Sequence, residues 1–297
     1  MPPPRLFQAY VMVDWSASSK PVTGADSIWI GVLKRNVRFQ MAFEAHNPAT
    51  RAAAEKLLED ILGDLRRKSE RVLVGFDFPL GFPRGTAAAL KLDGGPWRSL
   101  MEFLVREVKD KPDNTNNRFQ VGAKMNRLMM GEAFPFWGAP ARDEQTMLSA
   151  KRVREHGPND LPEFRLAEEA IKGPSSIWKL YYQGSVGGQA LTGIPVAKRL
   201  HDVRKVMFWP FETGWRPLSI SDVNDVDAVF AEIYPSLSAG KLAAGAVKDE
   251  VQVRAVCERF NALDEKGQLS ALFGPAKDDA RREIVESEEG WILGVSP

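Results

Sequence analysis

Two runs of apolar, β-forming residues that each end in an aspartate constrain the fold of this chain more than any other feature. Residues 10–13 lead into Asp14, and residues 72–76 lead into Asp77. Such runs are typical of strands buried in a parallel sheet. An ionised carboxylate is costly to bury unless it is paired or binds a cation, so packing alone does not explain these aspartates. Because ligands of open α/β sheets bind at the carboxyl ends of the strands, we predict one acidic site there.

Composition excludes several classes of function. The 297 residues are enough for one large domain, or for one domain with an extra lobe. The formal charge of +1 lacks the basic excess of proteins that bind nucleic acid tightly and without selectivity, so any nucleic-acid role requires a local patch. One cysteine rules out a disulfide framework, and the three histidines have no zinc-binding spacing. The N-terminal apolar run is too short for a signal peptide, so we expect a cytoplasmic protein without a membrane span.

The first predicted elements indicate a mixed sheet. Three strands follow one another closely and predict an antiparallel meander, at 6–14, 28–33 and 37–43. A helix is expected at 48–68, with Asn47 as its cap, because its apolar residues recur on one face. The strand that ends in Asp77 comes next, and a proline-rich turn terminates it.

Residues 84–200 change character. Polar, irregular segments alternate there with helical, aromatic ones, and no strong strand pattern is present. We therefore predict a helical insertion or lid at 84–200, carried by a core domain made of residues 1–83 and 201–297.

The sheet is expected to resume after the insertion. The later elements are two strands and a helix, at 205–210, 227–235 and 249–262. This order, with acids on the first and fourth strands, predicts the ribonuclease H-like topology, an α/β fold in which helices flank a mixed sheet. The first and fourth strands are neighbours in that topology, so Asp14 and Asp77 would face each other.

Two further acids are expected at the same edge, because Glu232 ends a late strand and Asp249 opens a helix. With Asp14 and Asp77 they would form an oxygen-rich pocket, which suits Mg²⁺ or Mn²⁺ rather than zinc. Two such ions about 4 Å apart activate a water and stabilise the leaving oxygen of a phosphodiester. We assign the three aspartates as metal ligands, with Asp14 shared, and Glu232 as a fourth ligand or a group that orients water.

Each of these acids also has a structural explanation. Asp77 precedes a tight turn, and the helix dipole favours an acid such as Asp249 in a first turn. The segment 15–20 after the first strand, Trp-Ser-Ala-Ser-Ser-Lys, favours ligand binding, with Ser16 and Lys20 as its candidate contacts.

Four stretches carry a resemblance to a known family, namely 13–16, 75–83, 231–235 and 289–292. Through them the chain resembles the family called domain of unknown function four-two-nine, described as predicted ribonuclease H-like nucleases. The resemblance covers about 1–83 and 205–297 and implies that fold with metal-dependent nuclease activity. Family members commonly carry an Asp-rich and Ala-rich helix before the last stretch, and the helix that begins near Asp249 departs from this pattern. The acidic ligand that this C-terminal region contributes, the fourth in chain order, therefore stays open between Asp249 and either Asp278 or Asp279.

Two signals in the insertion have alternative explanations. The glycine-rich stretch 182–193 lacks a phosphate-loop motif and favours a hinge or turn, with a phosphate cradle as the alternative. Aromatic and basic side chains could form a surface for a single strand, although the core of a lobe with a solvated charged face is the more common explanation. They are Trp137, Trp178, Tyr181, Tyr182, Lys151, Arg152 and Arg154.

Three hypotheses about function follow. The first is a metal-dependent nuclease or phosphodiesterase that uses Mg²⁺ or Mn²⁺. The second is a protein that binds a nucleotide or another phosphorylated small molecule, as in the actin-like relatives of this fold. The third is a binding module without catalysis, in which the acids are structural caps.

Overall fold

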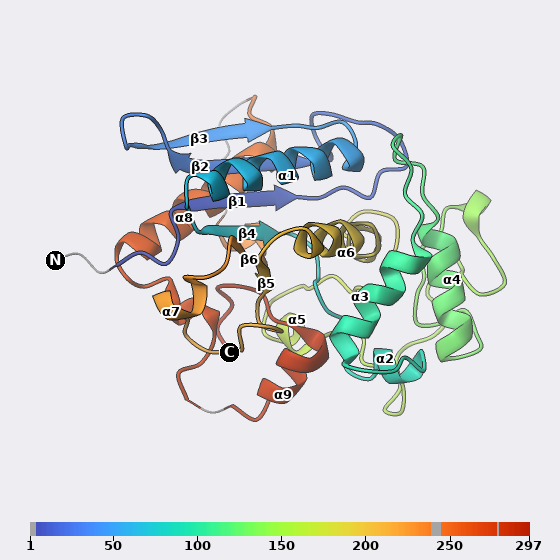
Figure 1. Cartoon of the computed structure of the whole chain (residues 1–297). Coiled ribbons are helices and arrows are strands. Elements are labelled where there is room, and N and C mark those ends of the chain that lie inside the picture. Colours follow the sequence, from blue (N-terminus) through green and yellow to red (C-terminus); the bar gives the residue numbers. More distant parts are fainter. Residues whose placement is uncertain (1–3, 239–244, 278) are drawn as a thin grey trace.

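The computed structural model describes residues 4–238, 245–277 and 279–297, which build a mixed six-stranded sheet with helices on both faces (Figure 1). The strands are β1 (Ala9–Asp14), β2 (Trp29–Arg35), β3 (Met41–His46), β4 (Val72–Phe76), β5 (Val206–Phe208) and β6 (Ala228–Glu232). Their order in the sheet is β3-β2-β1-β4-β6-β5. The first three strands form an antiparallel meander, and β4, β6 and β5 continue the sheet parallel to β1. The predicted α/β class with a mixed sheet is confirmed.

Five helices of the described residues have three turns or more: α1 (Arg51–Arg67), α3 (Pro96–Glu107), α4 (Arg118–Met129), α6 (Gly187–Asp202) and α8 (Lys248–Glu265). The short ones are α2 (Thr86–Ala89), α5 (Leu166–Glu169), α7 (Ile220–Val223) and α9 (Arg282–Ile284). Single 3₁₀ turns occur at Ala141–Asp143, Pro235–Leu237 and Ser270–Phe273, and a π-helical turn occurs at Val285–Glu289.

The alternation of side chains along the strands divides the core between the two faces of the sheet. Val11 and Val13 of β1 pack with apolar residues of α1 and α6 on one face. Tyr10 and Met12 pack with residues of α8 on the other face. By the same alternation, Asp14 belongs to the α8 face, and this places its carboxylate on the side where α8 begins.

The cap of α1 differs from the prediction. Thr50, rather than Asn47, accepts a hydrogen bond from a backbone N–H of the first turn, that of Ala53. The side chain of Asn47 instead binds the loop before β2. Its amide donates to the Ile28 carbonyl, and its oxygen accepts from the Gly24 N–H. Asn47 therefore ties down the loop between β1 and β2, a long-range role that a local helix-cap pattern does not reveal.

The helices of residues 84–200 gather beyond the carboxyl ends of the parallel strands (Figure 1). Apolar side chains of this segment belong to the same buried cluster as the α1 face of the sheet, as Phe103 of α3, Trp178 of a turn and Ile194 of α6 illustrate. The last helix of the segment, α6, ends at Asp202 and packs against β5 and α1. The segment thus shares its core with the sheet and covers the edge where Asp14 lies.

The C-terminal segment returns to the end of β6. Ile292 forms a bridge with Glu232, and the Leu293 N–H donates to the Glu232 carbonyl over 2.9 Å. Gly81 lies against the same segment so closely that a Cβ there would stand 2.4 Å from the Glu288 carbonyl oxygen. Three of the four stretches that carry the family resemblance therefore contact one another here.

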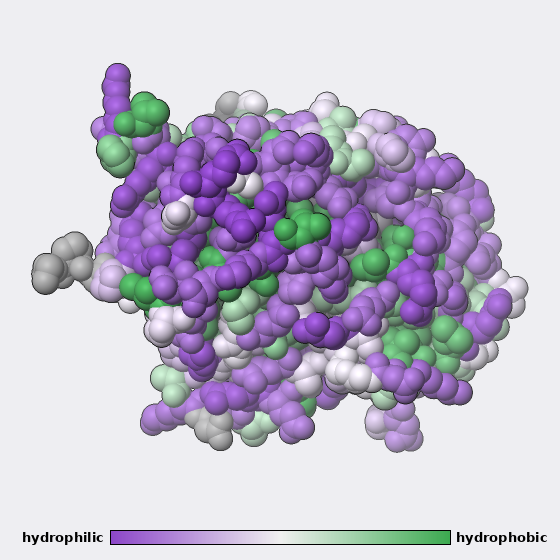
Figure 2. Space-filling view, in the orientation of Figure 1, coloured by the Kyte–Doolittle hydropathy of each residue, from purple (hydrophilic) through white to green (hydrophobic). Residues whose placement is uncertain are grey.

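The surface in the view of Figure 2 is mainly hydrophilic, with small separate apolar patches. One patch lies at the tip of the β2–β3 hairpin, where Val37 and Phe39 are exposed. None of the helices in the described parts of the chain has both the length and the apolar composition that crossing a membrane requires.

We predict that Gly81→Ala destabilises the protein by about 1–3 kcal/mol, because the new methyl group meets backbone atoms that cannot rotate away. Urea unfolding followed by circular dichroism measures this. Gly95→Ala is the matched control, since Gly95 has a φ of −67° and no atom within 4 Å of an added Cβ. Equal stability of the two variants would contradict the close packing of the C-terminal segment on Gly81.

Candidate functional site

Asp14 and Asp77 stand side by side at the carboxyl ends of β1 and β4. The two strands pair in parallel with Val13 opposite Phe76, and the Asp77 N–H extends the ladder by donating to the Val13 carbonyl over 3.1 Å. One oxygen of Asp77 accepts the Trp15 N–H over 2.7 Å, and the two carboxyl groups share a hydrogen bond. A hydrogen bond between two carboxyl groups requires a proton on one of them. The strand pairing thus forces the two side chains to share a site, as the sequence predicts.

The surroundings of Asp14 and Asp77 raise the pKa of both carboxyls above the values that these groups have in water. Burial, together with the negative charge of Asp249, raises the pKa of Asp14 to about 7, although the hydrogen bond with Asp77 lowers it in part. Burial, followed by the charge of Asp14, raises the pKa of Asp77 well above its ordinary value. Near neutral pH the pair therefore carries less than its full negative charge.

Two more aspartates complete the acidic side. Asp249, in the first turn of α8, accepts the Asp26 N–H over 2.8 Å, and burial raises its pKa. The charge of Asp26 acts on both Asp14 and Asp249 and raises the pKa of each. The sequence analysis missed Asp26, because an aspartate after Gly-Ala in a loop has the pattern of an ordinary solvated turn.

No salt bridge within the described residues reaches Asp14, Asp77 or Asp249. Lys248 lowers the pKa of Asp14 only through space. Across residues 4–238, 245–277 and 279–297, no three His, Cys, Asp or Glu side chains converge as a ready-made metal site. Two adjoining carboxylates are compatible with Mg²⁺, which commonly binds one or two protein carboxylates and takes its other ligands from water and phosphate oxygens.

Glu232 does not join the aspartates, and the expectation that it is a fourth ligand needs correction. It pairs with Phe76 in the sheet, one residue before Asp77, so alternation directs its side chain to the face opposite that of Asp14. Its two oxygens accept from Nη2 and Nη1 of Arg165 over 2.6 and 2.8 Å. Glu232 is thus neutralised by an arginine and serves the packing of the core.

Arg165 is the centre of a buried ionic network that links the insertion to the sheet. Its side chain is fully buried and also binds Glu168, while its Nη1 donates to the Glu289 carbonyl. The carboxylate of Glu289 accepts from the Leu166 N–H and from Arg84. The network joins four segments that are far apart in sequence and so fixes the insertion over the end of the sheet.

The alternative fourth ligands do not extend the cluster within the described residues. Asp279 binds Arg281 through both carboxylate oxygens, at 2.9 and 2.7 Å, and this arginine lowers the pKa of Asp279 to about 2. Asp278 lies outside the described residues.

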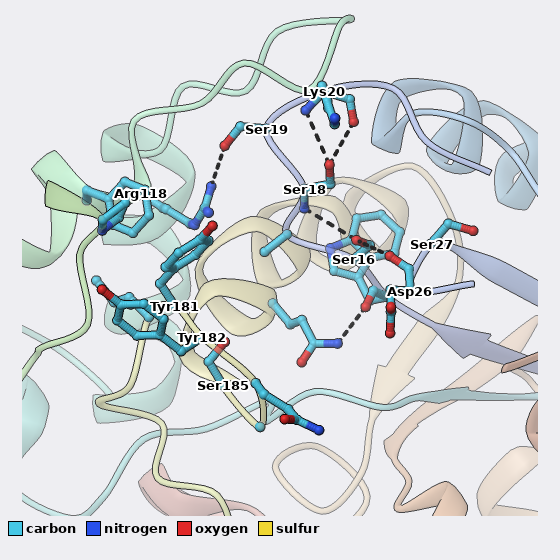
Figure 3. A pocket seen from close by; sticks show the side chains of 18 of the residues that line it. Ser16, Ser18, Ser19, Lys20, Asp26, Ser27, Arg118, Tyr181, Tyr182 and Ser185 are labelled. Atoms are coloured by element: carbon cyan, nitrogen blue, oxygen red, sulfur yellow. Dashed lines mark hydrogen bonds between the residues drawn. The ribbon is translucent and has the colours of Figure 1, made fainter. Parts of the chain in front are cut away.

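A pocket of about 730 Å³ opens beside the acidic side. It is lined by Asp14, Asp26 and Asp249, and the segment 15–20 with both candidate contacts, Ser16 and Lys20, forms part of its wall. Its other lining residues include Arg118, Arg142, Tyr181, Tyr182, Ser185 and Gln189. Figure 3 shows Arg118 and the two tyrosines on one side and Ser16, Asp26 and Ser27 on the other.

Arg51 holds the loop that forms this wall. Its Nη1 donates to the Ser16 and Ser18 carbonyls over 2.9 and 2.7 Å, while the same guanidinium pairs with Asp110. The hydroxyls of Ser16 and Ser18 bind backbone atoms of the loop, at Asp26 and Lys20. The loop is therefore held in one shape before a ligand arrives.

The glycine-rich stretch begins α6 instead of forming a free hinge. A Cβ on Gly187 would lie 2.0 Å from the Ile177 carbonyl oxygen, and one on Gly188 would lie 2.7 Å from the Leu180 carbonyl oxygen. The two glycines thus allow the first turn of α6 to pack onto the 177–180 backbone at the pocket. Of the nearby aromatic residues, Trp178 is buried core, whereas Tyr181 and Tyr182 are exposed at the pocket.

Comparisons with protein-family models, with curated proteins and with solved structures find no match to this chain.

We predict that Arg165→Leu destabilises the protein by about 3–5 kcal/mol, because it leaves Glu232 and Glu168 buried without a cation. Urea unfolding measures the change. Arg199→Leu is the matched control, since Arg199 pairs with Glu55 at the surface, where an ion pair contributes about 0–1 kcal/mol. Similar losses in the two variants would contradict the structural role given to Glu232.

We predict that Asp14→Asn stabilises the protein, by on the order of 2 kcal/mol at about pH 8, and has a much smaller effect at about pH 5. The folded state raises the pKa of Asp14, so it binds more protons than the unfolded state between about pH 4 and pH 7. Stability contributed by the protonated pair is therefore lost as the pH rises through 7, and the amide abolishes that loss. Urea unfolding in the presence of a chelator, with Asp93→Asn as the exposed control, tests this; an equal effect at both pH values would contradict it.

Proposed function

We propose that this chain is a metal-dependent hydrolase of phosphate esters, a phosphodiesterase or nuclease, built on a ribonuclease H-like fold. The observation that carries the proposal is the Asp14–Asp77 pair, which stands at the ends of neighbouring parallel strands without a cationic partner in the described residues. The meander β1–β3 followed by β4 beside β1 supports the fold, since this is the arrangement that the sequence pattern predicts.

The candidate ligands of Mg²⁺ or Mn²⁺ are Asp14 and Asp77, with Asp249 close to the pair. When bound, the cation supplies positive charge that lowers the pKa of a water and stabilises the developing charge on phosphate oxygens. The chain's part is to keep the two carboxylates together: strand pairing fixes their backbones, and the Trp15 N–H orients Asp77. Phosphate and water oxygens would fill the remaining positions.

Asp249 tunes the pair. Its charge raises the pKa of Asp14 and so increases the gain in free energy when positive charge enters the site. Asp26 holds Asp249 in place through its N–H and adds a further negative charge on the same side. In this proposal these two residues act through Asp14 and do not need to touch the cation.

A second candidate function is binding of a nucleotide or another phosphorylated small molecule without strand cleavage. The size of the pocket, about 730 Å³, favours it, because sites for small molecules commonly have several hundred cubic ångströms. Stabilisation of the protein by ATP and Mg²⁺ in thermal unfolding, together with no cleavage of any phosphodiester, would favour this candidate over the first.

We predict that the purified protein cleaves single-stranded nucleic acid or bis(p-nitrophenyl) phosphate with Mn²⁺ or Mg²⁺, and that Asp14→Asn lowers the rate by about 10²- to 10⁴-fold. Asp93→Asn, an exposed aspartate far along the chain, is the control and should retain the rate. Initial rates with chelator, Mg²⁺ and Mn²⁺ give the measurement. Cation-dependent cleavage that persists unchanged in Asp14→Asn would refute the site.

A further inference from the structure

Arg118 is a buried guanidinium at the pocket, and no acid of the described residues forms a salt bridge with it. Only 3% of the residue is exposed, although it lines the pocket. Its Nη1 donates to the Ser19 hydroxyl and to the Asn116 side-chain oxygen over 2.9 and 3.0 Å. Its Nε is buried and has no hydrogen-bond partner, and no salt bridge in the described part of the chain includes it.

The neighbouring arginine shows what a structural guanidinium looks like in the same region. Arg51 is equally buried, but it pairs with Asp110 and donates to three backbone carbonyls. Among the described residues, Arg118 has neither an acid nor a backbone carbonyl as partner, and its guanidinium lies over the Phe119 ring, 4.2 Å from the ring centre. Burial followed by the charge of Arg51 lowers its pKa to about 10. The other titratable groups that act on Arg118 are Asp143, which binds Arg142, then Tyr181, and Asp110 itself. A buried donor such as Nε without an acceptor costs free energy. The end of the guanidinium that remains for a ligand is Nη2, because the hydrogen bonds within the described residues use only Nη1.

Other hydrogen-bond donors lie beside the guanidinium of Arg118. The Ser19 hydroxyl oxygen accepts from Arg118, and this leaves its proton free for another acceptor. The first turn of α6 lies against the guanidinium, since a Cβ on Gly188 would stand 3.4 Å from Nε of Arg118. The positive end of a sixteen-residue helix therefore adds to the charge of the arginine.

Two aromatic rings stand beside this group of donors. Tyr181 and Tyr182 are 41% and 49% exposed, and their ring centroids lie 4.9 Å apart. Figure 3 shows both rings next to Arg118, on the side of the pocket that faces Ser16 and Asp26. Exposed tyrosines beside a phosphate site suit the stacking of a nucleobase.

We propose that Arg118, with the Ser19 hydroxyl and the first turn of α6, forms an anion subsite that binds a phosphate group of a nucleotide unit, with its base against Tyr181 and Tyr182. The subsite lies across the pocket from the aspartates. This inference rests on the proposed function, in which one phosphate of the substrate reacts beside the aspartates. It adds that Arg118 binds a second phosphate of the same substrate, which does not react and serves to position the substrate.

Calorimetric titration without divalent cations tests the subsite apart from catalysis. The probes are inorganic phosphate, AMP and a single-stranded hexanucleotide. We expect the wild-type protein to bind AMP more tightly than phosphate, and Arg118→Gln to weaken AMP binding by about 10- to 100-fold. Arg118→Lys, which keeps the charge but loses the planar fork, should fall between the two. Tighter binding of the hexanucleotide than of AMP would assign a strand as the natural ligand, and equal binding a free nucleotide.

Matched variants separate the anion subsite from the proposed hydrolase activity. Arg127→Gln removes an exposed charge from the same helix and should leave binding unchanged. Asp14→Asn should retain AMP binding, or tighten it because a negative charge across the pocket is removed, even where cleavage is lost. Failure of the proposed catalysis therefore leaves the subsite standing. If Arg118→Gln unfolds, Ser19→Ala replaces it and should weaken AMP binding several-fold. Unchanged affinity in a folded Arg118→Gln, or no binding of any probe by the wild type, would overturn the subsite.

Discussion

The pairing of β1 with β4 is the constraint on which the site depends. It places two aspartates at one level of the sheet, and they cannot separate without breaking the ladder between Val13 and Asp77. Burial raises the pKa of both carboxyls, and the charge of Asp249 on Asp14 and of Asp14 on Asp77 adds to this effect. Arg165 neutralises the buried Glu232 nearby, whereas no arginine or lysine forms a salt bridge with the aspartates in the described chain. The Asp14–Asp77 pair thus has no cationic partner among the described residues, beside the place where the pocket opens.

The strand-end aspartates and the sheet could be predicted because their signals are local. Apolar runs bounded by turns identify buried strands, and the acid at the end of such a run stands out against its neighbours. Alternation along β1 also fixes the face to which Asp14 belongs. The helix that carries Asp249 is equally local, since its apolar spacing and its first-turn acid identify where it begins.

The failures concern features that depend on register or on distant partners. Glu232 ends a strand like the two aspartates, but a shift of one residue in the pairing reverses the face of a side chain, and sequence does not give that register. Asn47 is a residue type that often caps helices, but its side chain forms a hydrogen bond with the Ile28 carbonyl, in a loop about twenty residues away. Arg118 looks like any first-turn arginine of a helix, and only the packing of α6 over it shows that it is buried.

The distribution of charge across the pocket restricts what it can bind. A ligand with phosphate groups gains at the Arg118 side but meets the negative charge of Asp14, Asp26 and Asp249 on the other side. A proton can neutralise the charge of Asp14, because the pKa of Asp14 is about 7, and a divalent cation can offset the charge of the Asp14–Asp77 pair. Protons and cations therefore compete for the same pair of carboxyls, and either one lowers the repulsion that a phosphate experiences. Of the two, only the cation also leaves the carboxylates ionised, so only the cation can combine tight binding of a phosphate with activation of a water beside it.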